Sequence, residues 1–208
     1  STLTTGLFDE VAVVCDSQII FDEITNNGGK AIMSKAEHEC GTDRIAEALD
    51  QFADADIVVN VQGDEPFTQK EPLEKLHQVF EGKDGAQVQV ASLMQELKDT
   101  ASIADPNYVK VAVDKKMNAL FFSRSVIPYP RDKEVATVYY EHIGIYAFRR
   151  QTLIDFTQIP MSPLEAAEKI ECLPYLENGI RMKMVVTEYM GVEIDTPEDL
   201  QRALALMG

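Results

Sequence analysis

Short apolar runs alternate with amphipathic segments through most of this chain. Strands are expected at 11–16, 30–33, 57–61 and 86–92, where Val, Ile and Ala dominate. Helices are expected at 17–26, from 42 to about 52 and at 69–80, where apolar side chains recur every three or four residues, and 3–10 reads as the tail of another helix. The alternation of strands and helices predicts an α/β fold with a mostly parallel sheet.

The middle of the chain has a different pattern. Residues 108–113 alternate between apolar and polar, 114–118 form a turn, and 119–123 are again apolar, which predicts an antiparallel hairpin followed by a strand at 140–148. We expect one domain over 1–208, with a smaller antiparallel region at about 105–150. This region is interpreted either as a homodimer contact or as the antiparallel edge of the sheet.

The last third predicts two capped helices and a strand between them. Ser162 and Glu165 form a capping box around Pro163, and this helix should run to about Cys172, where Pro174 stops or kinks it. A strand is expected at 181–187. Thr196 then caps a final helix, which leaves the preceding Asp195 carboxylate at a strand end, although Asp195 could itself be an alternative cap.

Composition limits the possible functions. The 208 residues are 45% hydrophobic. No apolar run reaches the roughly 18 residues of a membrane span, and residues 1–5 lack the character of a signal peptide. These two observations predict a cytoplasmic protein. The three cysteines form no C-x-x-C pair and suggest neither disulfides nor zinc. A net charge of -16 opposes binding to nucleic acid or to an anionic membrane, and an anionic ligand beside Asp64 would need a divalent metal between them.

Acidic residues end two of the predicted strands. The strand at 57–61 runs into Gln62, Gly63 and Asp64, and Asp195 follows a second apolar stretch. Ligands of open α/β sheets bind outside the carboxyl ends of strands. Two carboxylates there are the protein's minimal contribution to a Mg²⁺ site that also takes phosphate oxygens, which points to transfer at a nucleotide phosphate. The alternative for Asp64 is a solvated polar turn.

Arg44 is a candidate anion ligand. Thr42 can cap the helix that follows it, and Arg44 then lies in the first turn, where the helix dipole disfavours a cation. Arg44 therefore either faces an anion or belongs to a surface ion pair. His38 lies nearby between two glutamates, and a solvated loop is favoured there over a metal site.

Six motifs in order along the chain resemble those of the 3-deoxy-manno-octulosonate cytidylyltransferases, also called CMP-Kdo synthetases. They are GTDR at 41–44, VQGDEP at 61–66, FSR at 122–124, HIGIY at 142–146, SPLE at 162–165 and VEIDTPEDL at 192–200. The resemblance implies the nucleotidyltransferase type of Rossmann-like fold. It also implies attack by the anomeric hydroxyl of Kdo, an acidic eight-carbon sugar, on the α-phosphorus of CTP, for lipopolysaccharide synthesis.

Roles for individual residues also follow from the resemblance. Asp64 and Asp195 would be the catalytic pair that holds Mg²⁺, and Gln62 and His142 would face the sugar. Arg44 would lie on the nucleotide side. Arg124 and Tyr146 are further substrate-binding candidates, and related enzymes form homodimers through their partly antiparallel region.

Two departures from the family pattern affect these expectations. The family begins with a strand and a loop of the form P-A-R-x-x-S-x-R-x-x-G-K-P, which is not found here. We therefore expect the sequence to belong to a longer protein, and a polypeptide of these residues alone to expose open strand edges and to be inactive or nearly so. Related sequences also tend to carry Gln and Arg where this chain has Cys172 and Pro174.

The sequence leaves two alternative functions open. A cytidylyltransferase for another acidic sugar, such as a sialic acid or 8-amino-Kdo, would differ only in its acceptor pocket. A nucleotide-sugar-binding remnant without catalysis would have no need of both Asp64 and Asp195.

Overall fold

A computed structural model describes residues 2–35, 38, 41–63, 65, 68–188 and 201. Its strands are β1 (Val13–Cys15), β2 (Ala31–Met33), β3 (Ile57–Asn60), β4 (Val90–Leu97), β5 (Lys110–Val113), β6 (Ala119–Ser123), β7 (Tyr139–Arg149) and β8 (Met182–Val186). Its helices are η1 (Thr2–Thr5), α1 (Gln18–Asn26), α2 (Gly41–Ala48), η2 (Leu49–Gln51), α3 (Lys70–Gln78), α4 (Gly82–Gly85), α5 (Thr100–Ala104), α6 (Arg150–Phe156), α7 (Pro163–Glu168) and α8 (Leu173–Glu177).

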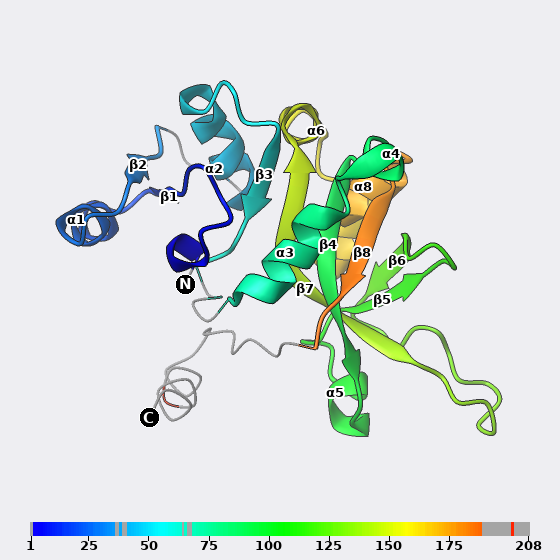
Figure 1. Ribbon diagram of the computed structural model, residues 1–208. Coiled ribbons are helices and arrows are strands. Elements are labelled where there is room, and N and C mark those ends of the chain that lie inside the picture. Colours follow the sequence, from blue (N-terminus) through cyan, green and yellow to red (C-terminus); the bar gives the residue numbers. More distant parts are fainter. Residues whose placement is uncertain are drawn as a thin grey trace.

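The long strand β7 is the centre of the main sheet (Figure 1). The sheet has the order β6-β5-β7-β4-β8, and β3 also pairs with β7. Because β3, β4 and β5 all pair with β7 antiparallel and β8 runs parallel to β4, four of the six strands share one direction. The chain is therefore α/β with most of its strands aligned, as predicted, but the inverted strand in the middle was not expected.

A second, parallel sheet is formed by β1 and β2, which lie with α1 at one side of the molecule (Figure 1). Within the described part of the chain, neither strand pairs with the main sheet, and β3 pairs with β7 alone. The edge of β3 that faces away from β7 therefore carries backbone groups without a strand partner among these residues.

Alternate residues of β7 pack against two hydrophobic clusters, one on each face of the main sheet. One cluster includes Tyr146 and Phe148 with α6 and α8, and the other includes Ile145 and Ala147 with α3. β3 contributes to both clusters, through Val58 on one face and through Ile57 and Val59 on the other. The sheet thus lies between helices, as the apolar run at 57–61 predicted.

Most predicted elements occur near their expected positions, with three corrections. Residues 3–10 hold only the turn η1 rather than the tail of a helix. The fourth strand lies further along than 86–92. The helix after Ser162 ends at Glu168 and is followed by Lys169 in a left-handed conformation. Pro174 falls in the first turn of the separate α8, where its missing N–H group breaks no helical hydrogen bond.

Candidate active site

An irregularity in β7 lies beside three of the predicted site residues, Gln62, His142 and Tyr146. β7 advances from Tyr146 to Ile143 while β4 advances by only one residue, so Gly144 and Ile145 form a bulge. Gln62 follows the end of β3 and lies over this bulge. A Cβ atom at Gly144 would come within 3.3 Å of the Gln62 side-chain nitrogen. The glycine therefore allows Gln62 to lie close to the strand that carries His142 and Tyr146.

His142 is partly buried between aromatic rings. Its centroid lies 4.9 Å from that of Phe122 and 5.3 Å from that of Tyr146. Its Nε2 atom lies 3.0 Å from the hydroxyl oxygen of Ser92, a fully buried residue of β4. Burial lowers the pKa of His142 to about 4, so the ring is neutral near pH 7.

Tyr146 extends the same face of β7 into the core. Its ring stacks on that of Phe148 at 5.8 Å, and its hydroxyl lies near the buried Cys172 thiol. Burial, together with the nearby Glu171 carboxylate, raises the pKa of the Cys172 thiol, and burial likewise raises the pKa of Tyr146. Both groups are therefore neutral, and Cys172 is an inert side chain at this wall of the site.

Arg44 lies in the first turn of α2, as predicted, and forms an ion pair. Its Nη2 atom is 2.6 Å from the carboxylate of Asp16, the residue that follows β1. Its Nε atom is buried and has no hydrogen-bond partner among the described residues. Thr42 is not a helix cap, because α2 already begins at Gly41. The Thr42 hydroxyl instead donates to Glu171, at 3.4 Å.

Arg124 is held by backbone groups. Its guanidinium donates to the carbonyl oxygens of Glu168 at 2.7 Å, Pro106 at 3.0 Å and Lys169 at 3.3 Å. The Glu168 carboxylate in turn accepts from the Ser123 hydroxyl at 2.8 Å and from the Arg124 backbone N–H at 2.9 Å. Arg124 thus joins the end of β6 to the end of α7, and at most two of its five N–H groups remain for a substrate.

The two predicted metal ligands, Asp64 and Asp195, lie outside the described residues. Within the described ranges, no three His, Cys, Asp or Glu side chains are grouped as a metal site would require. His38 instead pairs with Glu47, with 2.6 Å between Nε2 and the carboxylate, and Glu47 also accepts from the Lys35 backbone N–H. These hydrogen bonds lower the pKa of Glu47 and tie the loop before α2 to that helix.

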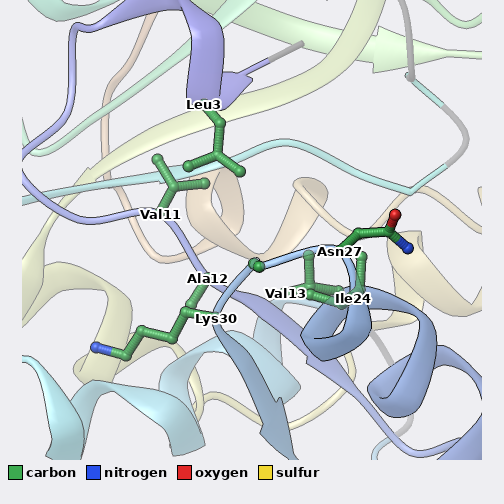
Figure 2. A pocket seen from close by; sticks show the side chains of 9 residues that line it. Leu3, Val11, Ala12, Val13, Ile24, Asn27 and Lys30 are labelled. Carbon is green, nitrogen blue, oxygen red and sulfur yellow. The ribbon is translucent and has the colours of Figure 1, made fainter.

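An apolar pocket beside α1 is separate from these residues (Figure 2). Leu3, Val11, Val13 and Ile24 line it. Its one charged side chain, Lys30, forms an ion pair with Glu10. No predicted site residue belongs to it. In the described part of the chain, no helix is long and apolar enough to cross a membrane.

Sequence reasoning missed two residues of the site, Ser92 and Gly144. Ser92 lies in an apolar strand, where a serine gives no signal by itself. Gly144 was noticed only as part of a motif, because the bulge that makes it necessary depends on how β7 is paired with β4.

Comparisons with known proteins identify close relatives. A sequence model of the cytidylyltransferase family matches residues 1–185. The chain is 57% identical over its whole length to the 3-deoxy-manno-octulosonate cytidylyltransferase of Flavobacterium johnsoniae, covering 84% of that protein. It is 56% identical to the protein of the same name from Christiangramia forsetii, covering 83% of it.

Solved structures give the same result. The chain superposes on a structure of CMP:2-keto-3-deoxy-manno-octonic acid synthetase complexed with CTP with a TM-score of 0.91 and 40% identity, covering 99% of this chain and 83% of that one. A 4-diphosphocytidyl-2C-methyl-D-erythritol synthase from Anaerococcus prevotii, at 18% identity and a TM-score of 0.62, shares the fold alone.

Proposed function

Since the chain belongs to the 3-deoxy-manno-octulosonate cytidylyltransferase family, we propose that the residues gathered around β7 bind Kdo while it receives CMP from CTP. The enzyme transfers CMP from CTP to Kdo and releases pyrophosphate. The anomeric oxygen of Kdo forms a bond to the α-phosphorus of CTP, the bond from that phosphorus to pyrophosphate breaks, and the hydroxyl proton is released.

The observation that carries the proposed sugar site is the position of Gln62 against Gly144 of the β7 bulge, two residues from His142 on the same strand. Gln62 comes from the end of β3, and His142 from β7 itself, with Tyr146 beside it. The Gln62 amide can donate and accept hydrogen bonds, and the neutral His142 ring, whose Nε2 already contacts Ser92, offers its Nδ1 atom. A polyhydroxylated sugar needs such a set of uncharged polar groups around it.

On the nucleotide side, we assign Arg44 to the phosphates of CTP. The ion pair with the half-exposed Asp16 leaves a buried Nε atom that no described group satisfies. A guanidinium can hold a phosphate with two parallel hydrogen bonds. Binding of CTP would therefore compete with Asp16 for Arg44.

Mg²⁺ is proposed as the cofactor, with Asp64 and Asp195 as its protein ligands. Two carboxylates suit Mg²⁺, which prefers oxygen ligands and fills its remaining positions with water and substrate phosphates. When bound, Mg²⁺ would neutralise charge on the triphosphate. In a chain with a net charge of -16, such a cation also offsets repulsion between the protein and two anionic substrates.

The antiparallel region at about 105–150 is proposed as the homodimer contact. Leu120, Tyr129, Val135 and Val138 are all at least half exposed there. The loop between β6 and β7 that carries three of them projects from one side of the sheet (Figure 1). Size-exclusion chromatography with light scattering should give about twice the mass of one protomer, and Leu120→Glu with Val135→Asp should give a monomer. A wild-type monomer at micromolar concentration would refute this part of the proposal.

The reaction belongs, we propose, to lipopolysaccharide synthesis in the cytoplasm, where CTP is available. The site assignment is tested with steady-state kinetics of pyrophosphate release. Gln62→Ala and His142→Gln should raise the KM for Kdo and leave the KM for CTP within about twofold, since a lost hydrogen bond contributes roughly 0.5–1.5 kcal/mol. Arg44→Gln should raise the KM for CTP and leave the KM for Kdo within about twofold. A Gln62→Ala enzyme with an unchanged KM for Kdo would refute the sugar site.

A further inference from the structure

Ser92 makes an unusual set of contacts behind the proposed sugar site. Its side chain is fully buried in β4 and faces the bulge of β7. Its hydroxyl oxygen lies 3.0 Å from His142 Nε2, 3.0 Å from the carbonyl oxygen of Ile143 and 3.0 Å from that of Ile145. We infer that Ser92 is a positioning residue that keeps the hydrogen of the His142 ring on Nε2, so that Nδ1 accepts a hydrogen bond from a hydroxyl group of the bound sugar.

The assignment follows from counting hydrogens around Ser92. A serine hydroxyl has one hydrogen and two lone pairs, whereas a carbonyl oxygen can only accept. The single Ser92 hydrogen is therefore directed to the carbonyl groups of Ile143 and Ile145, which face it at equal distances. The short contact with His142 is then a hydrogen bond only if Nε2 carries a hydrogen and donates it to Ser92.

The neutral ring has one further hydrogen-bonding atom. With the hydrogen on Nε2, Nδ1 carries a lone pair and can only accept. Among the residues that the structure describes, no hydrogen bond to His142 Nδ1 occurs, and His142 as a residue is only partly buried. The rings of Phe122 and Tyr146 pack against the imidazole and restrict its rotation. Nδ1 is thus an oriented acceptor at the edge of the site.

This orientation specifies the chemistry of the ligand group, and it rests on the proposed role of His142 in binding the sugar. A lone pair on Nδ1 attracts a hydroxyl hydrogen and repels a carboxylate oxygen. His142 therefore selects a hydroxyl group of Kdo, and the sugar carboxylate binds elsewhere. Ser92 contributes to binding without touching the substrate.

The direct test is ¹⁵N NMR of the imidazole nitrogens in the ligand-free protein. The chain has three histidines, and His142→Gln assigns the signals of His142. The wild-type ring should show a protonated Nε2 and an unprotonated Nδ1 near pH 7. A protonated Nδ1 would overturn the inference, and this measurement requires no variant at Ser92 to fold.

Variants of Ser92 test its influence on the sugar. Ser92→Ala should leave the His142 ring as a mixture of tautomers and raise the KM for Kdo about 2- to 13-fold, with the KM for CTP within twofold of the wild-type value. Ser92→Thr keeps the hydroxyl group and should restore both the single tautomer and the KM. An Ala variant with the wild-type tautomer and KM would overturn the inference.

The two proposals fail in different ways. If wild-type enzyme makes no CMP-Kdo, the proposed function is wrong whatever the tautomer. If wild-type enzyme makes CMP-Kdo and His142→Gln raises the KM for Kdo, but Ser92→Ala does not, His142 binds the sugar and Ser92 does not position it.

Discussion

Replacement of Gly144 by alanine should weaken sugar binding through the side chain of Gln62. The added Cβ would lie 3.3 Å from the Gln62 side-chain nitrogen and 3.7 Å from its Cδ atom. Carbon makes its best contacts at about 3.5–4.0 Å, so Gln62 must move by a few tenths of an ångström. Gly144 is not among the glycines with positive φ, and the backbone should accept alanine without strain.

The size of the effect follows from one displaced hydrogen bond. Loss of a hydrogen bond contributes about 0.5–1.5 kcal/mol, which corresponds to a rise of about 2- to 13-fold in the KM for Kdo. Replacing a glycine that needs no special backbone conformation tends to stabilise a protein by roughly 0.4–1 kcal/mol, so the free energy of unfolding should not fall. The KM values are measured from pyrophosphate release at varied concentrations of Kdo and CTP. The free energy of unfolding is measured by urea unfolding.

A double-mutant cycle tests whether the effect passes through Gln62. In the Gln62→Ala background the clash is absent, and Gly144→Ala should then change the KM for Kdo by less than about twofold. Equal effects of Gly144→Ala in both backgrounds would refute the reasoning, as would a Gly144→Ala enzyme whose KM for CTP rises while that for Kdo does not.

Three further predictions concern stability. The pKa of His142 is about 4 in the folded protein and 6.5 in an unfolded chain, so the unfolded state binds the extra proton first as the pH falls. Between about pH 7 and about pH 5, the free energy of unfolding of the wild type should therefore fall by up to about 2 kcal/mol more than that of His142→Gln. Equal losses in urea unfolding of the two proteins would contradict this. Leu73→Ala, at a fully buried position of α3, should lower the free energy of unfolding in urea by about 2–5 kcal/mol. The control Leu164→Ala, at an exposed position, should lower it by less than about 0.5 kcal/mol, and similar losses in the two variants would refute the described core. Glu168→Ala removes the acceptor for the buried Ser123 hydroxyl and for the Arg124 backbone N–H, and it should lower the free energy of unfolding by about 1–3 kcal/mol. An unchanged unfolding midpoint would show that these hydrogen bonds do not stabilise the protein.

Local signals in the sequence predicted most elements correctly. The capping box at Ser162 and Glu165 is formed as expected, and so is the hairpin of β5 and β6. The helix expected at 17–26 is α1. Each of these features depends on residues that are close together in the sequence, so local sequence patterns are enough to identify them.

Features that depend on distant pairing were not predictable in this way. Nothing in the apolar run of β7 indicates that it inserts antiparallel between β3 and β4, and the bulge at Gly144 exists only because of that pairing. The contact between Ser92 and His142 spans 50 residues of sequence. The Arg124 guanidinium was predicted as a substrate ligand from its motif, but the backbone carbonyl groups that it binds could not be identified from any pattern of side chains.

The resemblance of six motifs identified the family, and the comparisons confirm it. The roles of individual residues remain predictions. The structure shows that Gln62 and His142 approach the same bulge and that Arg44 has a carboxylate partner, and it does not describe Asp64 or Asp195. Asp64→Asn and Asp195→Asn should each abolish most turnover if they hold Mg²⁺, and wild-type turnover in either would refute the metal assignment.

Product formation is the most direct test of the central claim. The protein that carries this sequence would be incubated with CTP, Mg²⁺ and Kdo, and separately with a sialic acid in place of Kdo, and the products identified by mass spectrometry together with released pyrophosphate. CMP-Kdo and an equal amount of pyrophosphate should form with Kdo, and little or no product with the sialic acid. Absence of CMP-Kdo, or a faster reaction with the sialic acid, would contradict the assignment of this chain as a Kdo cytidylyltransferase.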